Sequence, residues 1–139
     1  MAQLAAKVVA LVLLCATPAL PSAVLRGEAQ AIRSVPRISI DELKVLMDQK
    51  AVLVIDVRDP ESFAKGRIPG AVNVDYTMVL KEAGRFAGET RTIVTYCACT
   101  NEMTAARASV DLAAKGIAGA KALKGGWDEW VQRGEKIER

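Results

Sequence analysis

Residues 92–102 read Thr92-Ile93-Val94-Thr95-Tyr96-Cys97-Ala98-Cys99-Thr100-Asn101-Glu102, and they indicate the class of the fold. Their first half is a run of apolar and β-branched residues, which is typical of a strand covered on both faces. A helical pattern follows from about Met103 to Lys115 and ends before Gly116. A buried strand that leads through a loop into a helix predicts an α/β fold.

The helix expected after this loop has two different faces. Its buried side is expected to consist of small and apolar residues: Ala106, Val110, Ala113 and Ala114. Its solvent side is expected to be a charged stripe at steps of four: Arg107, Asp111 and Lys115. A helix of this kind covers one face of a sheet.

Strand and helix signals alternate on both sides of this segment. The expected elements are a strand at 38–40, a helix at 41–48, a strand at 51–55, a strand at 120–123, a turn at Gly125-Gly126 and a helix at Trp127–Val131. This alternation predicts a parallel sheet with helices on both faces. Ligands of such sheets bind beyond the carboxyl ends of the strands, and Cys97 follows one of these ends.

The composition excludes several classes of site. None of the 139 residues is His, which rules out a Ser-His-Asp triad, a Cys-His pair and imidazole ligands for zinc or haem. The 19 basic and 16 acidic residues give a net charge of +3, too small to predict nucleic-acid binding. Two neighbouring thiols alone make a weak metal site. We therefore expect chemistry from Cys, carboxylates, Lys, Arg or backbone amides, with no metal and no cofactor.

The N-terminal segment has the layout of a secretory signal. Lys7 precedes an apolar run from Val8 to Ala16, and prolines follow this run. Because no charge occurs between Val8 and Leu25, an uncleaved membrane anchor is the alternative. The expected organisation is a signal peptide or N-terminal membrane anchor at 1–31, a linker at 32–37 and a folded domain at 38–139. The protein is expected to be exported, periplasmic or otherwise extracytoplasmic, with membrane contact only through the N-terminal segment.

Motifs on both sides of the loop resemble the signatures of rhodanese-like domains. The first signature is matched by Asp56-Val57-Arg58-Asp59-Pro60-Glu61-Ser62-Phe63 and Gly66-Arg67-Ile68-Pro69-Gly70-Ala71-Val72-Asn73. The second is matched by Leu123-Lys124-Gly125-Gly126-Trp127 and by Trp130. Between them, a strand ends in Tyr96-Cys97 before a loop and a helix, as in the active site of that family. The resemblance spans about residues 38 to 133.

This resemblance implies a three-layer α/β fold, with a central parallel five-stranded sheet flanked by helices on both faces. It also implies a sulfurtransferase that carries sulfane sulfur as a persulfide on Cys97 and passes it to a thiophilic acceptor. The implied partners are a small sulfur donor and a thiol or cyanide-like acceptor, which includes a protein thiol. The active-site loop then comprises Cys97 and the residues Ala98, Cys99, Thr100, Asn101 and Glu102.

The chemistry of the loop agrees with this implication. A thiolate is the reactive form of cysteine, and Cys97 stands just before an expected helix N-terminus, which stabilises a negative charge. Successive backbone N–H groups in a tight loop can hold a thiolate or persulfide without a cationic side chain. The alternative is that Cys97 is only a small buried residue at a strand end.

The loop departs from the usual sulfurtransferase pattern, in which an Arg follows the cysteine after four intervening residues. Glu102 occupies that position, and Met103 stands where a Ser or Thr is usual. With Asn101 as the expected N-cap, Glu102 would lie in the first helical turn and complement the helix dipole. A carboxylate there competes with the Cys97 thiolate for the same positive potential. We therefore regard thiosulfate as an uncertain donor.

Cys99 is a second departure, and two roles are open for it. It is either an incidental, partly exposed thiol or a second thiol that accepts sulfur from Cys97 or resolves its persulfide. Outside the loop, Asp56 and Arg58 flank Val57 on one strand face and are expected to pair as structural supports. Trp127 and Trp130 are expected to cover the core, with Trp127 near the pocket.

Two other functions compete with sulfur transfer. One is a catalytically silent rhodanese-like module that presents its loop to a protein partner. The other is thiol-disulfide redox chemistry at Cys97 and Cys99. The sequence does not identify the sulfur donor, the acceptor or the oligomeric state.

Overall fold

The computed structural model describes residues 22–139. Its elements are α1 (Ser22–Ser34), β1 (Arg37–Ile38), α2 (Ile40–Asp48), β2 (Val52–Asp56), α3 (Pro60–Lys65), β3 (Val72–Asn73), the 3-10 helix η1 (Tyr76–Met78), α4 (Val79–Glu82), the 3-10 helix η2 (Ala83–Phe86), β4 (Thr92–Tyr96), α5 (Met103–Ala114), β5 (Lys121–Leu123) and α6 (Gly126–Gln132). Within this range, no helix is both long enough and apolar enough to cross a membrane.

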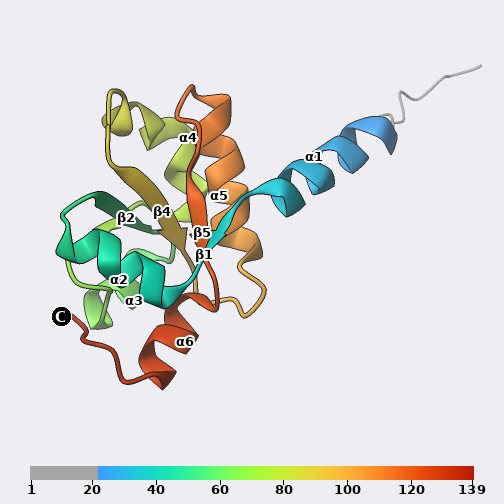
Figure 1. Ribbon diagram of the computed structural model, residues 1–139. Coiled ribbons are helices and arrows are strands. Elements are labelled where there is room, and N and C mark those ends of the chain that lie inside the picture. The colour runs from blue at the N-terminus through green and yellow to red at the C-terminus, as the bar shows by residue number, and fades with distance from the viewer. Residues whose placement is uncertain (1–21) are drawn as a thin grey trace, which may run out of the picture.

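The strands form one five-stranded sheet in the order β1-β5-β4-β2-β3. Every pairing is parallel, which confirms the predicted fold class. The pair β2 and β4 is in register from Val52 beside Thr92 to Asp56 beside Tyr96. Because β4 lies in the middle of the sheet (Figure 1), the loop that follows Tyr96 begins at the centre of the carboxyl edge.

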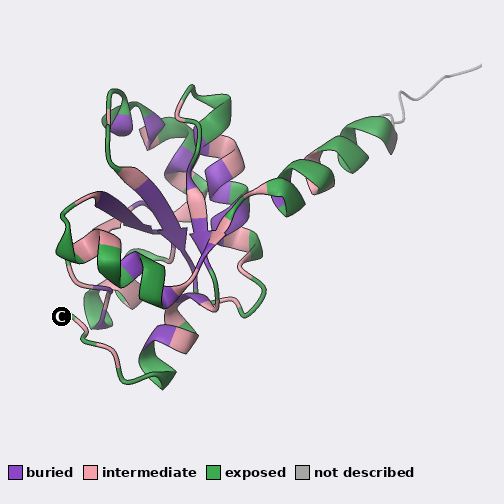
Figure 2. Cartoon of the chain, in the orientation of Figure 1, coloured by how far each residue is buried: buried purple, intermediate pink, exposed green. Residues whose placement is uncertain are grey.

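Helices cover both faces of the sheet, so the molecule has three layers (Figure 1). One face packs on residues of α1, α4 and α5, and the other packs on residues of α2, α3 and α6. The central strands are the most buried (Figure 2): every residue of β2 is buried, and so is every residue of β4 after Thr92. Successive residues of β4 alternate between the layers: Ile93 belongs to the core under α5, and Val94 belongs to the core under α2.

Helix α5 packs on the sheet through residues that only partly match the expected set. Ala106 is buried as expected, and Val110 is partly buried against the same core. The buried residues of the helix are Ala105, Ala106, Ala108, Ser109 and Leu112. Ala113 and Ala114 are exposed, contrary to expectation. In an alanine-rich helix, small residues on every side weaken the periodicity that marks the buried face. Ser109 completes the contact, because its hydroxyl lies 3.0 Å from the Thr95 hydroxyl inside the core.

The segment expected to be a linker, residues 32–37, is part of the folded structure. Ile32 and Ser34 belong to the last turns of α1, and Arg37 opens β1. Helix α1 projects from the body of the domain (Figure 1) but docks at its C-terminal end, where Ile32 is 5% exposed. Glu28 of α1 also forms an ion pair with Arg107 of α5. The leader or anchor predicted for residues 1–31 lies mostly outside the described residues and stays a prediction.

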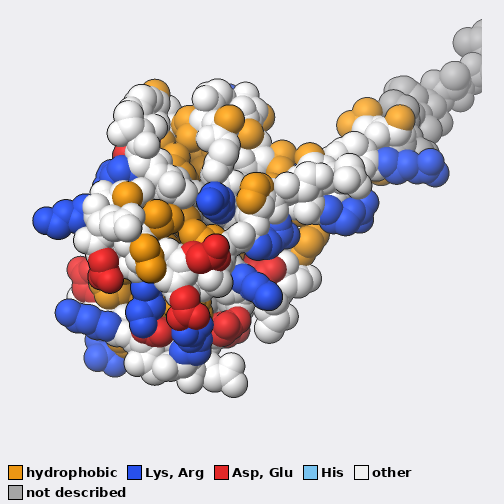
Figure 3. All heavy atoms as spheres, in the orientation of Figure 1, with side chains coloured by type: hydrophobic (Ala, Val, Ile, Leu, Met, Phe, Trp, Pro, Cys, Tyr) orange, Lys and Arg blue, Asp and Glu red, His pale blue; other side chains and the backbone are white. Residues whose placement is uncertain are grey.

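The start of α2 also differs from the expected pattern. Ile40 was expected in a strand, but it is the first residue of α2. Ser39 caps this helix, with its side chain accepting from the Glu42 backbone N–H while the Glu42 side chain accepts from the Ser39 backbone N–H. Acidic and basic side chains lie close together on the lower part of the molecule in Figure 3, and Lys44 of α2 pairs with Glu135, which follows α6, at 2.7 Å. Such pairs tie α2 to the C-terminal segment.

Candidate active site

Cys97 directly follows β4 and turns its side chain toward the layer that contains α5. The residue is 4% exposed and belongs to the same core as Ile93 and Leu112. The preceding residue, Tyr96, points into the opposite layer, where the centre of its ring lies 6.4 Å from that of the Trp127 ring. Because successive side chains of a strand point to opposite faces, the sulfur atom of Cys97 and the ring of Tyr96 lie on opposite faces of the sheet.

The loop from Ala98 to Asn101 presents backbone N–H groups that have no protein partner among the described residues. Within residues 22–139, none of the backbone N–H groups of these four residues donates to a protein acceptor. The Glu102 backbone N–H donates to the Cys99 carbonyl at 3.1 Å and closes the loop as a turn. Helix α5 begins at Met103, so its positive N-terminus faces the same region. Unpaired N–H groups at a helix N-terminus are suited to hold an anion, including a thiolate or a persulfide.

The end of the loop differs from the prediction. Glu102, and not Asn101, is the N-cap residue of α5, and its φ of 53° places it in the left-handed region. The Asn101 side-chain oxygen makes a long contact, accepting from the Met103 backbone N–H at 3.4 Å. An Asn before an acidic residue favours Asn as the N-cap. In the structure the helix begins one residue later, so Glu102 takes the N-cap position.

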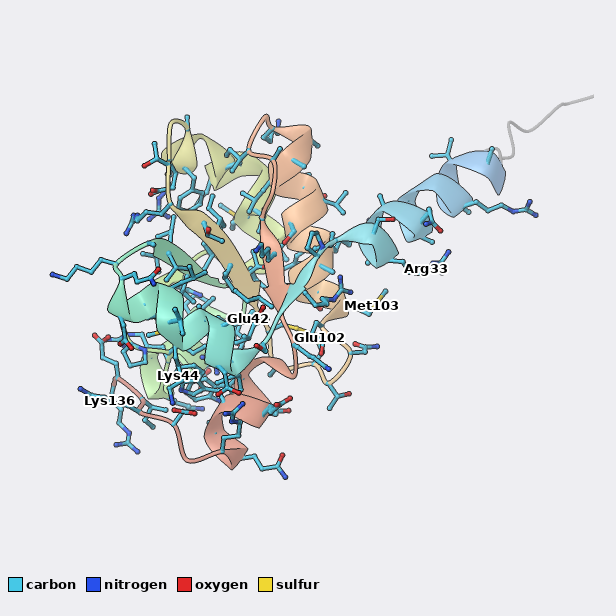
Figure 4. All side chains as sticks on the ribbon, viewed as in Figure 1. Arg33, Glu42, Lys44, Glu102, Met103 and Lys136 are labelled. Carbon is cyan, nitrogen blue, oxygen red and sulfur yellow. A yellow bond between two sulfur atoms is a disulfide. The ribbon has the colours of Figure 1, made fainter. Side chains whose placement is uncertain are left out.

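The Glu102 side chain points away from α5, toward β1 and the turn before α6 (Figure 4). Its Oε1 accepts a hydrogen bond from the Gly125 backbone N–H at 2.7 Å, and its Oε2 lies 3.7 Å from Nε of Arg37. The side chain is 13% exposed. Glu102 therefore connects the loop to the turn before α6 and to β1, in place of the predicted position over the helix dipole.

The turn formed by Gly125 and Gly126 holds the other end of the loop. Both residues are left-handed, with φ values of 73° and 54°. A Cβ atom at Gly126 would overlap the Cys97 carbonyl oxygen, so only glycine fits there without displacement. This close approach lets the Trp127 backbone N–H donate to that carbonyl at 2.8 Å. The second family-like motif thus fixes the backbone of Cys97.

A buried polar network lies below the loop, on the side away from the sulfur. Asp56 is fully buried, and Arg58 binds it with two nitrogen atoms at 3.0 and 2.6 Å. The predicted ion pair is therefore present. Arg58 also donates to the Gly66 carbonyl at 2.7 Å, and its guanidinium lies 4.2 Å from the centre of the Trp127 ring.

Tyr96 connects this network to the central strand. Its hydroxyl donates to Asp56 and accepts from the Ile68 backbone N–H at 3.2 Å. Burial raises the pKa of the Tyr96 phenol well above its usual value, and the nearby charge of Asp56 raises it further. The phenol therefore stays a hydrogen-bond donor across the physiological range. No role was expected for Tyr96 from the sequence, because its partner Asp56 lies 40 residues away on a neighbouring strand.

The structure brings Asp56, Arg58 and Trp127 together with one another, but not with the sulfur of Cys97. The Trp127 ring packs on the face of the sheet opposite to that of Cys97. Trp127 contacts the loop through its backbone N–H, which donates to the Cys97 carbonyl. These residues therefore position the strand ends that carry the loop.

Cys97 and Cys99 are joined by a disulfide in this structure. Their Cα atoms lie 5.5 Å apart. Ala98, between them, is exposed, and Cys99 is half-buried against the core under α5. The loop therefore brings the two sulfur atoms together.

Arg37 is a residue that the sequence analysis did not connect with the site. The linker prediction placed it outside the domain, whereas β1 sets it beside Glu102. Its Nε is buried and, among the described residues, has no hydrogen-bond partner. The same part of the chain contains no group of three or more Cys, Asp or Glu side chains arranged to hold a metal ion.

Comparison with known proteins agrees with this architecture. A model of the rhodanese-like domain family matches residues 39–133. Thiosulfate sulfurtransferase GlpE of Pseudoalteromonas translucida is 29% identical over 108 residues, covering 73% of this chain and 95% of that protein. Thiosulfate sulfurtransferase 16 of Arabidopsis thaliana, a chloroplast protein, is 29% identical over 91 residues, covering 58% of this chain and 74% of that protein. The solved rhodanese-like domain of an Anabaena protein is 26% identical, with a TM-score of 0.65 over 74% of this chain and 78% of that chain.

Proposed function

Because this chain belongs to the rhodanese-like domain family, we propose that it is a sulfurtransferase in which Cys97 carries sulfane sulfur as a persulfide. Curated relatives of the chain are named thiosulfate sulfurtransferases, which supports the class of reaction. The observation that carries the proposal is the position of Cys97. It lies at the central carboxyl edge of the sheet, at the base of a loop whose N–H groups have no protein acceptor within residues 22–139.

The reaction divides into two displacements at sulfur. In the first, the Cys97 thiolate attacks the outer sulfur of the donor, and the remainder of the donor leaves with the bonding electron pair. In the second, the acceptor attacks the outer sulfur of the persulfide, and the Cys97 thiolate leaves. The N–H groups of residues 98–101 would hold the negative charge that both steps place in the loop. The network of Asp56, Arg58 and Tyr96 would keep the strand ends rigid during both steps.

The contacts of Glu102 bear on the choice of donor. Its carboxylate accepts a hydrogen bond from the Gly125 N–H and forms an ion pair with Arg37. The positive charge of Arg37 is therefore offset by Glu102 before an anionic sulfur donor arrives. A doubly charged donor such as thiosulfate would approach a loop that ends in a carboxylate. We therefore propose that donors with less negative charge are used more efficiently than thiosulfate.

The test is cyanide-dependent turnover of the reduced full chain with a panel of sulfur donors, followed as thiocyanate. We expect turnover in a Cys15→Ser, Cys99→Ser variant, in which Cys97 is the one remaining cysteine of the three in the sequence. We expect no turnover when Cys97→Ser is added, because a serine hydroxyl cannot form a persulfide. Equal turnover in both variants would refute Cys97 as the carrier. No turnover in either, from folded protein and with every donor, would favour the catalytically silent binding module.

A further inference from the structure

The disulfide gives Cys99 a chemical role beyond that of a loop residue. We propose that Cys99 resolves the Cys97 persulfide, so that its outer sulfur is released as hydrogen sulfide and the Cys97–Cys99 disulfide is the product. This step rests on the proposed persulfide chemistry of Cys97. It adds a second activity, in which sulfane sulfur is reduced to sulfide at the expense of a dithiol.

The loop has the geometry that this reaction needs. The Cα atoms of the two cysteines are 5.5 Å apart, which falls inside the range of roughly 4.4–6.8 Å that disulfides require. The sulfur of Cys99 therefore reaches the inner sulfur of a persulfide on Cys97 with the loop as it stands. Both ends of the loop are held meanwhile, since Trp127 binds the Cys97 carbonyl and Gly125 binds the Glu102 carboxylate.

Atoms and electrons balance without an added oxidant. The Cys99 thiolate attacks the Cys97 sulfur atom, the bond between the two persulfide sulfurs breaks, and the outer sulfur leaves with the electron pair and its proton as hydrosulfide. The sulfane sulfur is thereby reduced, and the two cysteines are oxidised to the disulfide. A dithiol then reduces this disulfide and becomes a disulfide itself. One dithiol is oxidised for each sulfide that is released.

The exposure of the two residues sets the order of the reductive step. Cys97 is 4% exposed, whereas Cys99 is half-buried and stands beside the exposed Ala98. An external thiol therefore reaches the sulfur of Cys99 first and forms a mixed disulfide there. Cys97 leaves as the thiolate, next to the N–H groups of the loop, and is ready to accept sulfur again.

An attack at the outer sulfur would have a different result. The sulfur would then move to Cys99 as a new persulfide, no sulfide would leave, and Cys97 would return as a thiol. The bond that the structure contains joins the two cysteine sulfur atoms directly, which is the product of attack at the inner sulfur. The two routes differ in both released product and protein mass.

A single turnover without reductant separates these routes. The Cys15→Ser chain is reduced, freed of reductant under anaerobic conditions, and mixed with one equivalent of benzenethiosulfonate, whose leaving group is a sulfinate and not a thiol. We expect one equivalent of sulfide and a protein that has lost the mass of two hydrogen atoms. In the Cys15→Ser, Cys99→Ser chain, we expect a gain of one sulfur atom and no sulfide. The Cys15→Ser, Cys97→Ser chain should show neither change.

Each other outcome contradicts a definite part of the account. If the Cys15→Ser chain keeps its added sulfur for as long as the Cys15→Ser, Cys99→Ser chain does, Cys99 does not resolve the persulfide. Sulfur loading of Cys97 would then still stand. If the added sulfur is found on Cys99 after alkylation and digestion, the relay is correct and resolution is wrong. If no chain that retains Cys97 gains sulfur or releases sulfide, the proposed function itself fails.

Discussion

The Glu102 carboxylate accepts a hydrogen bond from the Gly125 backbone N–H at 2.7 Å, across the gap between the loop and the turn before α6. Two residues later, the Trp127 backbone N–H donates to the Cys97 carbonyl at 2.8 Å. One short turn therefore holds both the first and the last residue of the loop. This arrangement explains why a carboxylate at the end of the loop is compatible with the fold.

Removing the charge of Glu102 should improve the use of thiosulfate. Gln in Glu102→Gln can still accept from Gly125, but the loop loses a negative charge that repels a doubly charged donor. We expect kcat/KM for thiosulfate to rise roughly tenfold, the effect of about 1.4 kcal/mol. The control is Glu61→Gln, which neutralises an exposed carboxylate on α3. An equal response of both variants would show that Glu102 does not influence the donor.

Gly126→Ala should reduce the stability of the fold. The added Cβ would overlap the Cys97 carbonyl oxygen in a left-handed residue, so we expect a loss of at least about 2 kcal/mol in the free energy of unfolding. Gly84→Ala is the matched control, because its Cβ would meet no atom within 4 Å. Denaturant unfolding of both variants gives the comparison. A Gly126→Ala protein as stable as the control would refute the close approach of the turn to Cys97.

Arg58 should contribute far more stability than an exposed arginine or lysine. Its side chain is 8% exposed and its partner Asp56 is fully buried, so Arg58→Ala leaves a buried charge unpaired, at a cost of about 3–5 kcal/mol. Lys65→Ala breaks the exposed pair with Glu61 and should cost less than about 0.5 kcal/mol. Urea unfolding at neutral pH measures both. Similar losses in the two variants would contradict the structural role given to the buried pair.

Stability should fall at alkaline pH because of Tyr96. Burial raises the pKa of this phenol in the folded protein, so its stabilising effect is complete below the unfolded pKa of about 10 and is lost as the pH rises above it. Between pH 9 and pH 11, the parent should lose about 1.4 kcal/mol more than Tyr96→Phe. Unfolding free energies of both proteins at the two pH values test this. Parallel losses would mean that Tyr96 ionises normally in the folded chain.

The sequence predicted the layers of the fold and the place of Cys97, because continuous apolar runs and their order along the chain are strong signals. It failed where small residues obscured the pattern, as at Ala113 and Ala114 of α5, which are exposed. It also missed the docking of Ile32 and the entry of Arg37 into β1, since a two-residue strand leaves almost no periodicity to detect.

The fine geometry of the loop depended on contacts between distant segments. The left-handed conformation of Glu102 and its bond to Gly125 join residues that are far apart in the sequence, and a local capping pattern predicted Asn101 instead. The pairing of Asp56 with Arg58 was predictable, because both residues lie on one short stretch of chain. The presence of Tyr96 in the same network was not, because its partner belongs to a neighbouring strand.

The central claim is that Cys97 carries sulfur, and the intact mass of the Cys15→Ser, Cys99→Ser chain tests it most directly. In this chain Cys97 is the one remaining thiol of the three in the sequence. We predict that a sulfane donor adds the mass of one sulfur atom and that cyanide removes it. An unchanged mass with every donor, measured on folded and reduced protein, would contradict the account.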